Sequence, residues 1–194
     1  MKLDLGIPSS SSLSAAIQFS KLAERSSLNC IWIKETHKAQ REIFTVATII
    51  LLETSKVKVG IEVTNLLDRN ISTIARAAAT LSQIGKGRLR LILDAALPKA
   101  SMRDAATLLR RIWRGETVTF TSDRFRLSNY YARYRPSFAT PIWFCARDPK
   151  LLALAGEIAD GVILSGPKRY IEKAVAIVDQ GLRKRKRRRG SFRF

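Results

Sequence analysis

The sequence is poor in the side chains from which metal sites, disulfides and nucleophilic triads are built. It has a single histidine, His37, and two cysteines, Cys30 and Cys145, each inside an apolar run. Cysteines in such runs are typical of small buried hydrophobic residues. A lone histidine offers neither a Cys/His metal cluster nor a Ser/His/Asp triad. We therefore expect no bound metal.

Acidic residues are also scarce, since 16 Asp and Glu stand against 35 Lys and Arg, which gives a formal net charge of +19. Part of the excess lies in residues 183–189, every one of which is Arg or Lys. Such runs usually belong to solvated or disordered ends. Hydrophobic residues make up 46% of the chain, which argues against disorder of the whole. A length of 194 residues predicts one domain with a sizeable core.

Long apolar runs are absent. No run reaches the roughly 18 residues that a membrane span requires. Lys2 and Asp4 interrupt the first apolar residues, so no secretory leader is recognisable there. We expect a cytoplasmic protein without a membrane partner.

Short apolar runs alternate with segments of helical periodicity. Strands are expected at 3–7, 30–33, 57–63, 89–93, 142–146 and 162–164, and helices at 13–25, 42–52, 71–84, 105–113, 149–158 and 170–182. Residues 117–127 alternate around Ser122 and Asp123, which predicts a hairpin. Strands that alternate with helices indicate an α/β fold with a parallel sheet.

About six strand-helix units plus a hairpin are too few for a closed eight-unit barrel, which typically takes about 250 residues. The chain is either an open doubly wound sheet or a barrel that lacks its end. The periodicity by itself does not decide between the two.

Specific motifs resemble the bacterial luciferase-like monooxygenase superfamily, and in particular its coenzyme F420-dependent branch of methylenetetrahydromethanopterin reductase-like proteins. They are KVKVGIEVTN at 56–65, AATL at 78–81, WRGETV at 113–118, ARDPK at 146–150 and, most specific, AGEIADGVI at 155–163. The motifs occur in the family's order, and the resemblance covers residues 3–182. It implies an incomplete (β/α)8 TIM barrel that transfers hydride between a flavin or F420 coenzyme and an organic substrate.

The resemblance also implies where the coenzyme ring would lie. Glu35 follows the second strand, where relatives place an acidic residue near the reacting ring, so it is the candidate catalytic residue. Glu62 and Val63 fall where the family has a non-prolyl cis peptide whose bulge backs the ring. Thr64 and Asn65 end that strand, on the side of the pocket.

The coenzyme's phosphate is expected at the loop that opens the helix at 149–158. The family contact maps onto Ala146, Arg147, Asp148, Pro149 and Lys150. A helix N-terminus suits an anion because it presents free N–H groups and the positive end of the helix dipole. Ser165 and Gly166 follow the sixth strand and form the next loop on the same face.

Three departures from the family pattern stand out. The turn after the fourth strand, residues 91–96, has none of the glycines usual there, and Glu62 stands where a small residue is usual. After residue 182 the expected strand-helix units give way to the basic run. We therefore divide the chain into a truncated barrel domain, 1–182, and a basic disordered tail, 183–194.

The sequence thus predicts an F420-dependent or FMN-dependent oxidoreductase acting on a small-molecule substrate. The alternative is a non-catalytic, truncated remnant or a partner-dependent subunit of that family, with a tail that binds nucleic acid only weakly and without specificity. An incomplete barrel exposes two sheet edges, which a homo-oligomer or another chain could cover.

Overall fold

The computed structural model describes residues 3–34, 41–63, 66, 69–94 and 97–194. Six strands form one parallel sheet in the order β1-β2-β3-β4-β7-β8. Their bounds are Asp4–Pro8, Cys30–Lys34, Lys58–Val63, Leu89–Asp94, Ile142–Cys145 and Gly161–Ile163. The strands neighbour one another in chain order, without the reversal that defines a doubly wound sheet. The fold is therefore a half-barrel. The sequence pattern had left open whether the sheet was doubly wound or part of a barrel.

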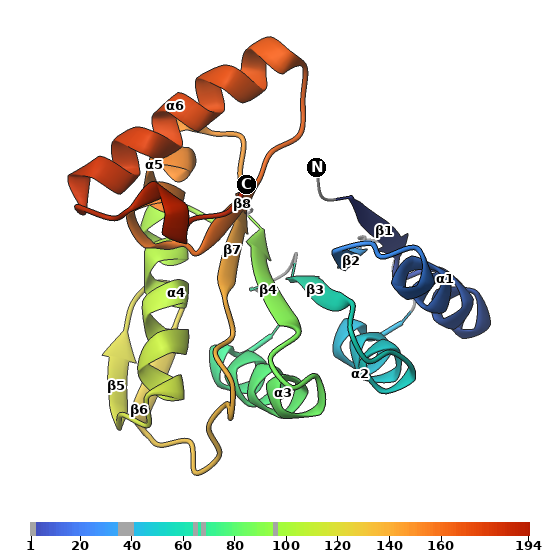
Figure 1. Cartoon of the computed structure of the whole chain (residues 1–194). Coiled ribbons are helices and arrows are strands. Elements are labelled where there is room, and N and C mark those ends of the chain that lie inside the picture. The colour runs from blue at the N-terminus through green and yellow to red at the C-terminus, as the bar shows by residue number, and fades with distance from the viewer. Residues whose placement is uncertain (1–2, 35–40, 64–65, 67–68, 95–96) are drawn as a thin grey trace.

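The helices α1 to α5 lie along the outer side of the curved sheet (Figure 1). The helices are α1 (Leu13–Arg25), α2 (Ile43–Glu53), α3 (Ile71–Ile84), α4 (Lys99–Trp113), α5 (Pro149–Ile158) and α6 (Lys168–Lys184). The core lies between sheet and helices, where alternate strand residues such as Ile31, Ile61 and Phe144 are fully buried. The other strand face turns inward, as the two-residue period of a strand requires.

Local signals set most element bounds. Asn70 caps α3 by accepting from the Ser72 N–H at 3.0 Å, and Gly85 ends it. α4 begins at Lys99, six residues earlier than the periodicity of 105–113 predicts. Its first turn buries Ser101 and Met102 without the apolar repeat that marks the rest. No helix in the described segments is long and apolar enough to cross a membrane.

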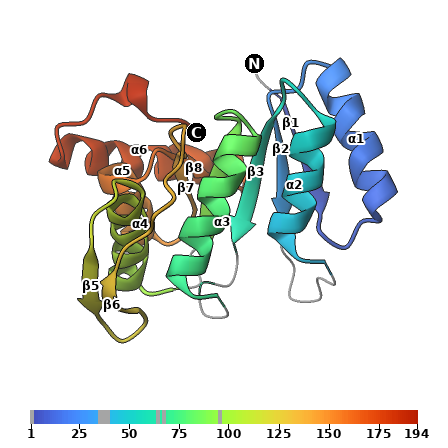
Figure 2. The same ribbon diagram turned by 90° about the horizontal axis from the view of Figure 1, so that it is seen from below.

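The predicted hairpin forms a separate two-stranded sheet, β5 (Val118–Thr121) and β6 (Arg126–Tyr130). It lies beside α4 and outside the main sheet (Figures 1 and 2). The hairpin is thus an insertion between α4 and β7 that does not take part in the barrel wall.

The basic run is ordered, which corrects the expectation of a disordered tail at 183–194. α6 continues to Lys184, a 3-10 helix follows at Arg189–Ser191, and Phe192 is 3% exposed within the core. Arg193 then pairs in parallel with Gly161 at the outer edge of β8, where the Val162 N–H donates to its carbonyl at 3.0 Å.

Partners within the fold explain this order. Lys184 contacts Glu157 at 2.9 Å, Arg189 contacts Asp179, and the Arg187 guanidinium donates to the Gly156 carbonyl at 3.0 Å. These contacts neutralise or satisfy cations that a sequence reading treats as solvated. A boundary at residue 182 therefore falls inside α6.

Candidate active site at the carboxyl ends of the strands

A cavity of about 450 Å³ opens at the carboxyl ends of the inner strands. It is lined by Lys34, Glu62, Cys145, Ala146, Arg147, Asp148, Leu151, Ile163 and Ser165. These residues come from the ends of β2, β3, β7 and β8, from the start of α5 and from the loop after β8. The chemistry of (β/α) barrels is built at this end of the strands. The volume lies within the range of small-molecule sites, about 300 to 1,000 Å³.

Glu62 places a buried carboxylate in this cavity. Its side chain is 9% exposed, and its Oε1 lies 3.9 Å from the Nζ of Lys34. Lys34 and Glu62 are neighbours in the parallel register of β2 and β3, which puts both side chains on the inner face. A buried charge requires such compensation. The cavity therefore holds a paired carboxylate and ammonium.

The N-terminus of α5 does not offer the free N–H groups expected there. The backbone N–H groups of Lys150 and Leu151 donate to Asp148 Oδ1 at 2.8 and 3.2 Å. Pro149 has no N–H, and the Leu152 N–H donates to the Asp148 carbonyl at 2.9 Å. Asp148 is thus an internal anion at the position where a phosphate was expected. The cations that remain for a phosphate are the exposed side chains of Arg147 and Lys150.

The loop that carries Arg147 is held by the following element. The Tyr170 hydroxyl, from α6, donates to the Arg147 carbonyl at 3.1 Å. A Cβ on Gly166 would come within 2.8 Å of the Tyr170 ring, so only glycine fits that loop without displacement. Contacts between the loops after β7 and β8 therefore fix the rim of the cavity.

Five of the twelve predicted site residues line this cavity. They are Glu62, Ala146, Arg147, Asp148 and Ser165. Pro149 and Lys150 form the first turn of α5, and Gly166 follows Ser165. Val63 ends β3, and no cis peptide bond occurs among the described residues, so the cis bond expected at Glu62 and Val63 is not confirmed. Glu35, Thr64 and Asn65 lie outside the described residues, as does His37.

Sequence reasoning missed four residues that line the cavity, Lys34, Cys145, Leu151 and Ile163. Cys145 is half-buried at the end of β7, whereas it was expected to be a buried hydrophobic residue. Cys30 fits that expectation, because burial and then the charge of Asp4 raise the pKa of its thiol to about 12. Lys34, Cys145 and Ile163 each lie at the carboxyl end of a strand, which is the signal that could have found them.

No set of three potential metal ligands gathers within the described ranges. The ionic groups of the cavity instead suit an organic anion. Arg147, Lys150 and the Ser165 hydroxyl can contact a phosphate, and Lys34 and Glu62 can face a polar ring edge. An anionic coenzyme fits this donor set through side chains and not through the α5 backbone.

The family model described as luciferase-like monooxygenase matches residues 2–194. The chain is 31% identical over 187 residues to the 5,10-methylenetetrahydromethanopterin reductase of Archaeoglobus fulgidus, an alignment that covers 89% of this chain and 55% of the relative. It is 28% identical over 191 residues to the F420-dependent glucose-6-phosphate dehydrogenase of Kineococcus radiotolerans, covering 84% of this chain and 57% of the relative.

Solved structures share the fold. The coenzyme F420-dependent tetrahydromethanopterin reductase of Methanopyrus kandleri superposes with a TM-score of 0.90 at 20% identity, over 98% of this chain and 63% of that one. A riboflavin lyase with a modified FMN superposes with a TM-score of 0.85 at 12% identity, over 99% of this chain and 60% of that one. The chain thus spans little more than half the length of the relatives that it matches.

Proposed function

This chain belongs to the luciferase-like monooxygenase family, and from that premise we propose that it binds coenzyme F420 at the carboxyl ends of its strands. The cavity lined by Glu62, Arg147 and Ser165 is the observation that carries the proposal. The relatives that are named for F420 support F420 as the coenzyme. FMN remains the alternative because the riboflavin lyase with a modified FMN shares the fold. The proposed activity is that of an oxidoreductase acting on a small organic substrate.

Each residue of this site has a proposed role. Arg147 and Lys150 provide the charge for the phosphate, and the Ser165 hydroxyl provides a further donor. The bound coenzyme would supply the hydride chemistry, and the protein would supply binding and orientation. Glu62, held by Lys34, fixes one negative charge at the cavity wall and accepts hydrogen bonds from the polar edge of a ring. Glu35 remains the proposed catalytic residue on the strength of the resemblance.

A second candidate is a non-catalytic family member or a subunit that needs a partner chain. One observation favours it. Asp148 already accepts hydrogen bonds from the backbone N–H groups of Lys150 and Leu151 at the start of α5. No described strand pairs with the outer edge of β1, and this edge is the surface that a homo-oligomer or another chain would cover. Ion pairs hold part of the basic run, which supports no more than weak, unspecific binding of nucleic acid.

Equilibrium titration with F420 and, separately, with FMN tests the proposal through coenzyme fluorescence. We expect saturable binding of F420 that weakens at least tenfold in Arg147→Ala, because a charge-assisted contact is worth about 1.5 to 3 kcal/mol. Arg25→Ala is the matched control, since Arg25 is an exposed cation at the end of α1. Absence of binding by the folded chain would favour the non-catalytic alternative.

A further inference from the structure

A second cavity, of about 160 Å³, lies at the opposite end of the strands from the proposed coenzyme site. It is lined by Asp4, Asn29, Cys30, Trp32, Lys58, Arg90, Trp143, Arg193 and Phe194. All but Arg193 and Phe194 come from the β1–β4 and β7 strands or the residue before β2. This cavity shares no lining residue with the proposed coenzyme site.

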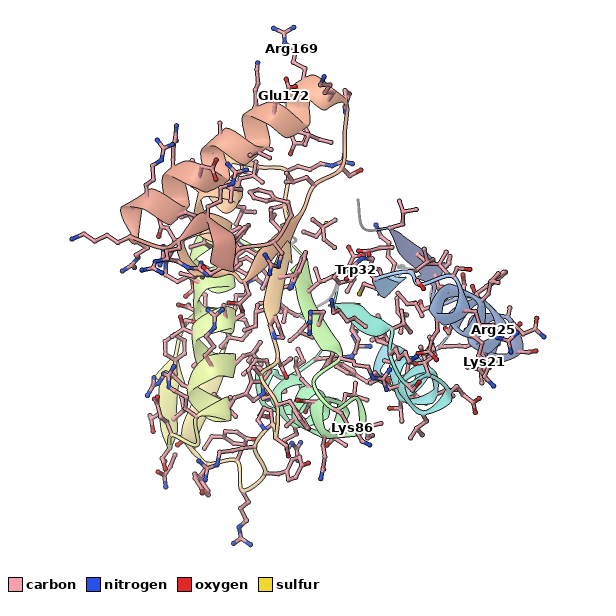
Figure 3. All side chains as sticks on the ribbon, in the orientation of Figure 1. Lys21, Arg25, Trp32, Lys86, Arg169 and Glu172 are labelled. Carbon is pink, nitrogen blue, oxygen red and sulfur yellow. The ribbon has the colours of Figure 1, made fainter. Side chains whose placement is uncertain are left out.

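Two tryptophans form the wall of this cavity on the inner face of the sheet. The ring centroids of Trp32 and Trp143 are 5.4 Å apart, with the planes tilted by 56°. Trp32 covers Gly60 and Trp143 covers Gly161, and a Cβ at either glycine would overlap the ring. In Figure 3, Trp32 lies on the inner side of the sheet, whereas Lys21 and Arg25 lie on the outer side of α1. The glycines thus give the indole rings room to lie flat against the strands.

The charges around the rings are unbalanced. Lys58, Arg90 and Arg193 are cations, and Asp4 is the one side chain among the lining residues that carries a carboxylate. Lys58 is engaged, because its ammonium donates to the Asn29 side-chain carbonyl at 2.8 Å. Asp4 is already engaged, because it accepts from the Trp32 indole N–H at 2.8 Å and from the Asn29 amide at 3.0 Å. The burial of Cys30 raises the pKa of its thiol to about 12, so the thiol stays neutral and adds no negative charge.

Arg90 is the cation with the clearest need for an anion. It is half-buried, and burial lowers its pKa. Its guanidinium donates to the Gly87 and Leu89 carbonyls, at 3.1 and 2.7 Å, both through Nη1. Within the described part of the chain, no hydrogen bond runs from Nε or Nη2 of Arg90 or from the Trp143 indole N–H. The cavity is therefore rich in donors and poor in acceptors.

The geometry points to a binding site for a small aromatic carboxylate, with the ring packed against the Trp32–Trp143 pair and the carboxylate on Arg90. The size agrees, since a cavity of about 150 Å³ takes up one benzene ring in a protein core. Tilted aromatic rings attract a third ring, and guanidinium groups bind carboxylates with two parallel hydrogen bonds. Neither feature is used by the coenzyme site, so this inference does not depend on the proposed function.

Benzoate is the probe. We expect it to shift the indole N–H resonances of Trp32 and Trp143 in a ¹H–¹⁵N spectrum and to leave Trp113 unchanged. Trp113 is an internal control because its indole donates to the Ala75 carbonyl at 3.0 Å, away from the cavity. Benzyl alcohol keeps the ring and lacks the charge, and acetate keeps the charge and lacks the ring. Each should bind at least tenfold more weakly than benzoate.

Arg90→Gln should weaken benzoate binding at least tenfold, and the matched variant Arg25→Gln should leave it unchanged. If Arg90→Gln does not fold, Arg193→Gln replaces it, since the Arg193 side chain is exposed and donates to the Gly190 carbonyl at 3.1 Å. A loss of several-fold is expected there. Equal binding of benzoate and benzyl alcohol, shifts spread over all three tryptophans, or binding insensitive to both variants would overturn the proposal.

Discussion

Asp148 is the residue on which the nature of the coenzyme site depends. Its carboxylate satisfies the first two available N–H groups of α5 and places a negative charge where a phosphate would lie. A carboxylate at a helix N-terminus is favoured by the helix dipole, typically by about 0.3 to 1 kcal/mol, so Asp148 competes with an incoming anion. The competing carboxylate of Asp148 is thus part of the ARDPK motif itself.

Replacing Asp148 by serine should raise the affinity for FMN. Serine still caps the helix, which preserves stability, and it removes the repelling charge. We expect FMN to bind about three- to tenfold more tightly to Asp148→Ser, whereas riboflavin, which lacks the phosphate, should bind as before. Titrations of both ligands by fluorescence measure this. Asp123→Ser in the hairpin turn is the control, and an equal gain for riboflavin would contradict the explanation.

At the scale of the helices, Glu157 connects three elements. It lies on α5, with its side chain 3% exposed, and contacts Arg103 of α4 at 2.6 Å and Lys184 of α6 at 2.9 Å. Burial alone would raise its pKa, but the hydrogen bonds from Arg103 and Lys184 lower the pKa to about 2. The network therefore requires an ionised carboxylate, and it also orders the start of the basic run.

Glu157→Gln should lower the free energy of unfolding by about 1.5 to 3 kcal/mol at neutral pH, as for loss of a charge-assisted hydrogen bond. A pKa below the ordinary 4.5 means that the carboxylate stabilises the fold above that value. This stabilisation is lost as pH falls from about 4.5 towards 2. Urea unfolding at several pH values should show the difference between wild type and Glu157→Gln shrinking over that range.

The exposed pair of Lys168 and Glu172, 4.0 Å apart on α6, gives the control. Glu172→Gln should change the free energy of unfolding by less than about 0.5 kcal/mol, because solvent screens exposed ion pairs. If both variants lost the same free energy of unfolding, the buried network at Glu157 would contribute no more to stability than an exposed ion pair.

At the scale of the whole molecule, the half-barrel has two sheet edges, and one is partly covered. Arg193 pairs with the outer edge of β8 through two backbone hydrogen bonds. The Val162 N–H donates to the Arg193 carbonyl at 3.0 Å, and the Arg193 N–H donates to the Asp160 carbonyl at 3.2 Å. Phe192, 3% exposed, anchors this segment in the core. The bridge occupies the place that a further parallel strand would take after the crossover through α6.

Phe192→Ala should therefore destabilise the molecule and free the β8 edge. Truncation of a buried phenylalanine typically costs about 3 to 5 kcal/mol. An uncovered edge promotes pairing between chains, so we also expect self-association. Chemical unfolding and light scattering after size exclusion measure the two effects. Phe194→Ala is the matched control because Phe194 is 47% exposed, and a disordered tail would make both variants silent.

Helices α3 and α5, the parallel α/β class and the family could all be predicted from the amino-acid sequence. The signals that bound these helices act within a few residues, so they can be recognised without knowledge of the fold. They are the cap at Asn70, the glycine at 85 and the Asp148-Pro149 pair. The motif residues could be recognised for the same reason. Among them, Arg147, Asp148 and Ser165 line one cavity.

The order of the strands in the sheet, and with it the partner of each charged side chain, depends on tertiary packing. Lys34 meets Glu62 because β2 and β3 are neighbours in register, although 28 positions separate the two residues. The basic run becomes ordered because Glu157, Asp160 and Asp179 meet its cations. Such pairings depend on packing between distant segments, which no local pattern encodes. The same packing brings Trp32 to Trp143 and leaves Arg90 beside them without a carboxylate.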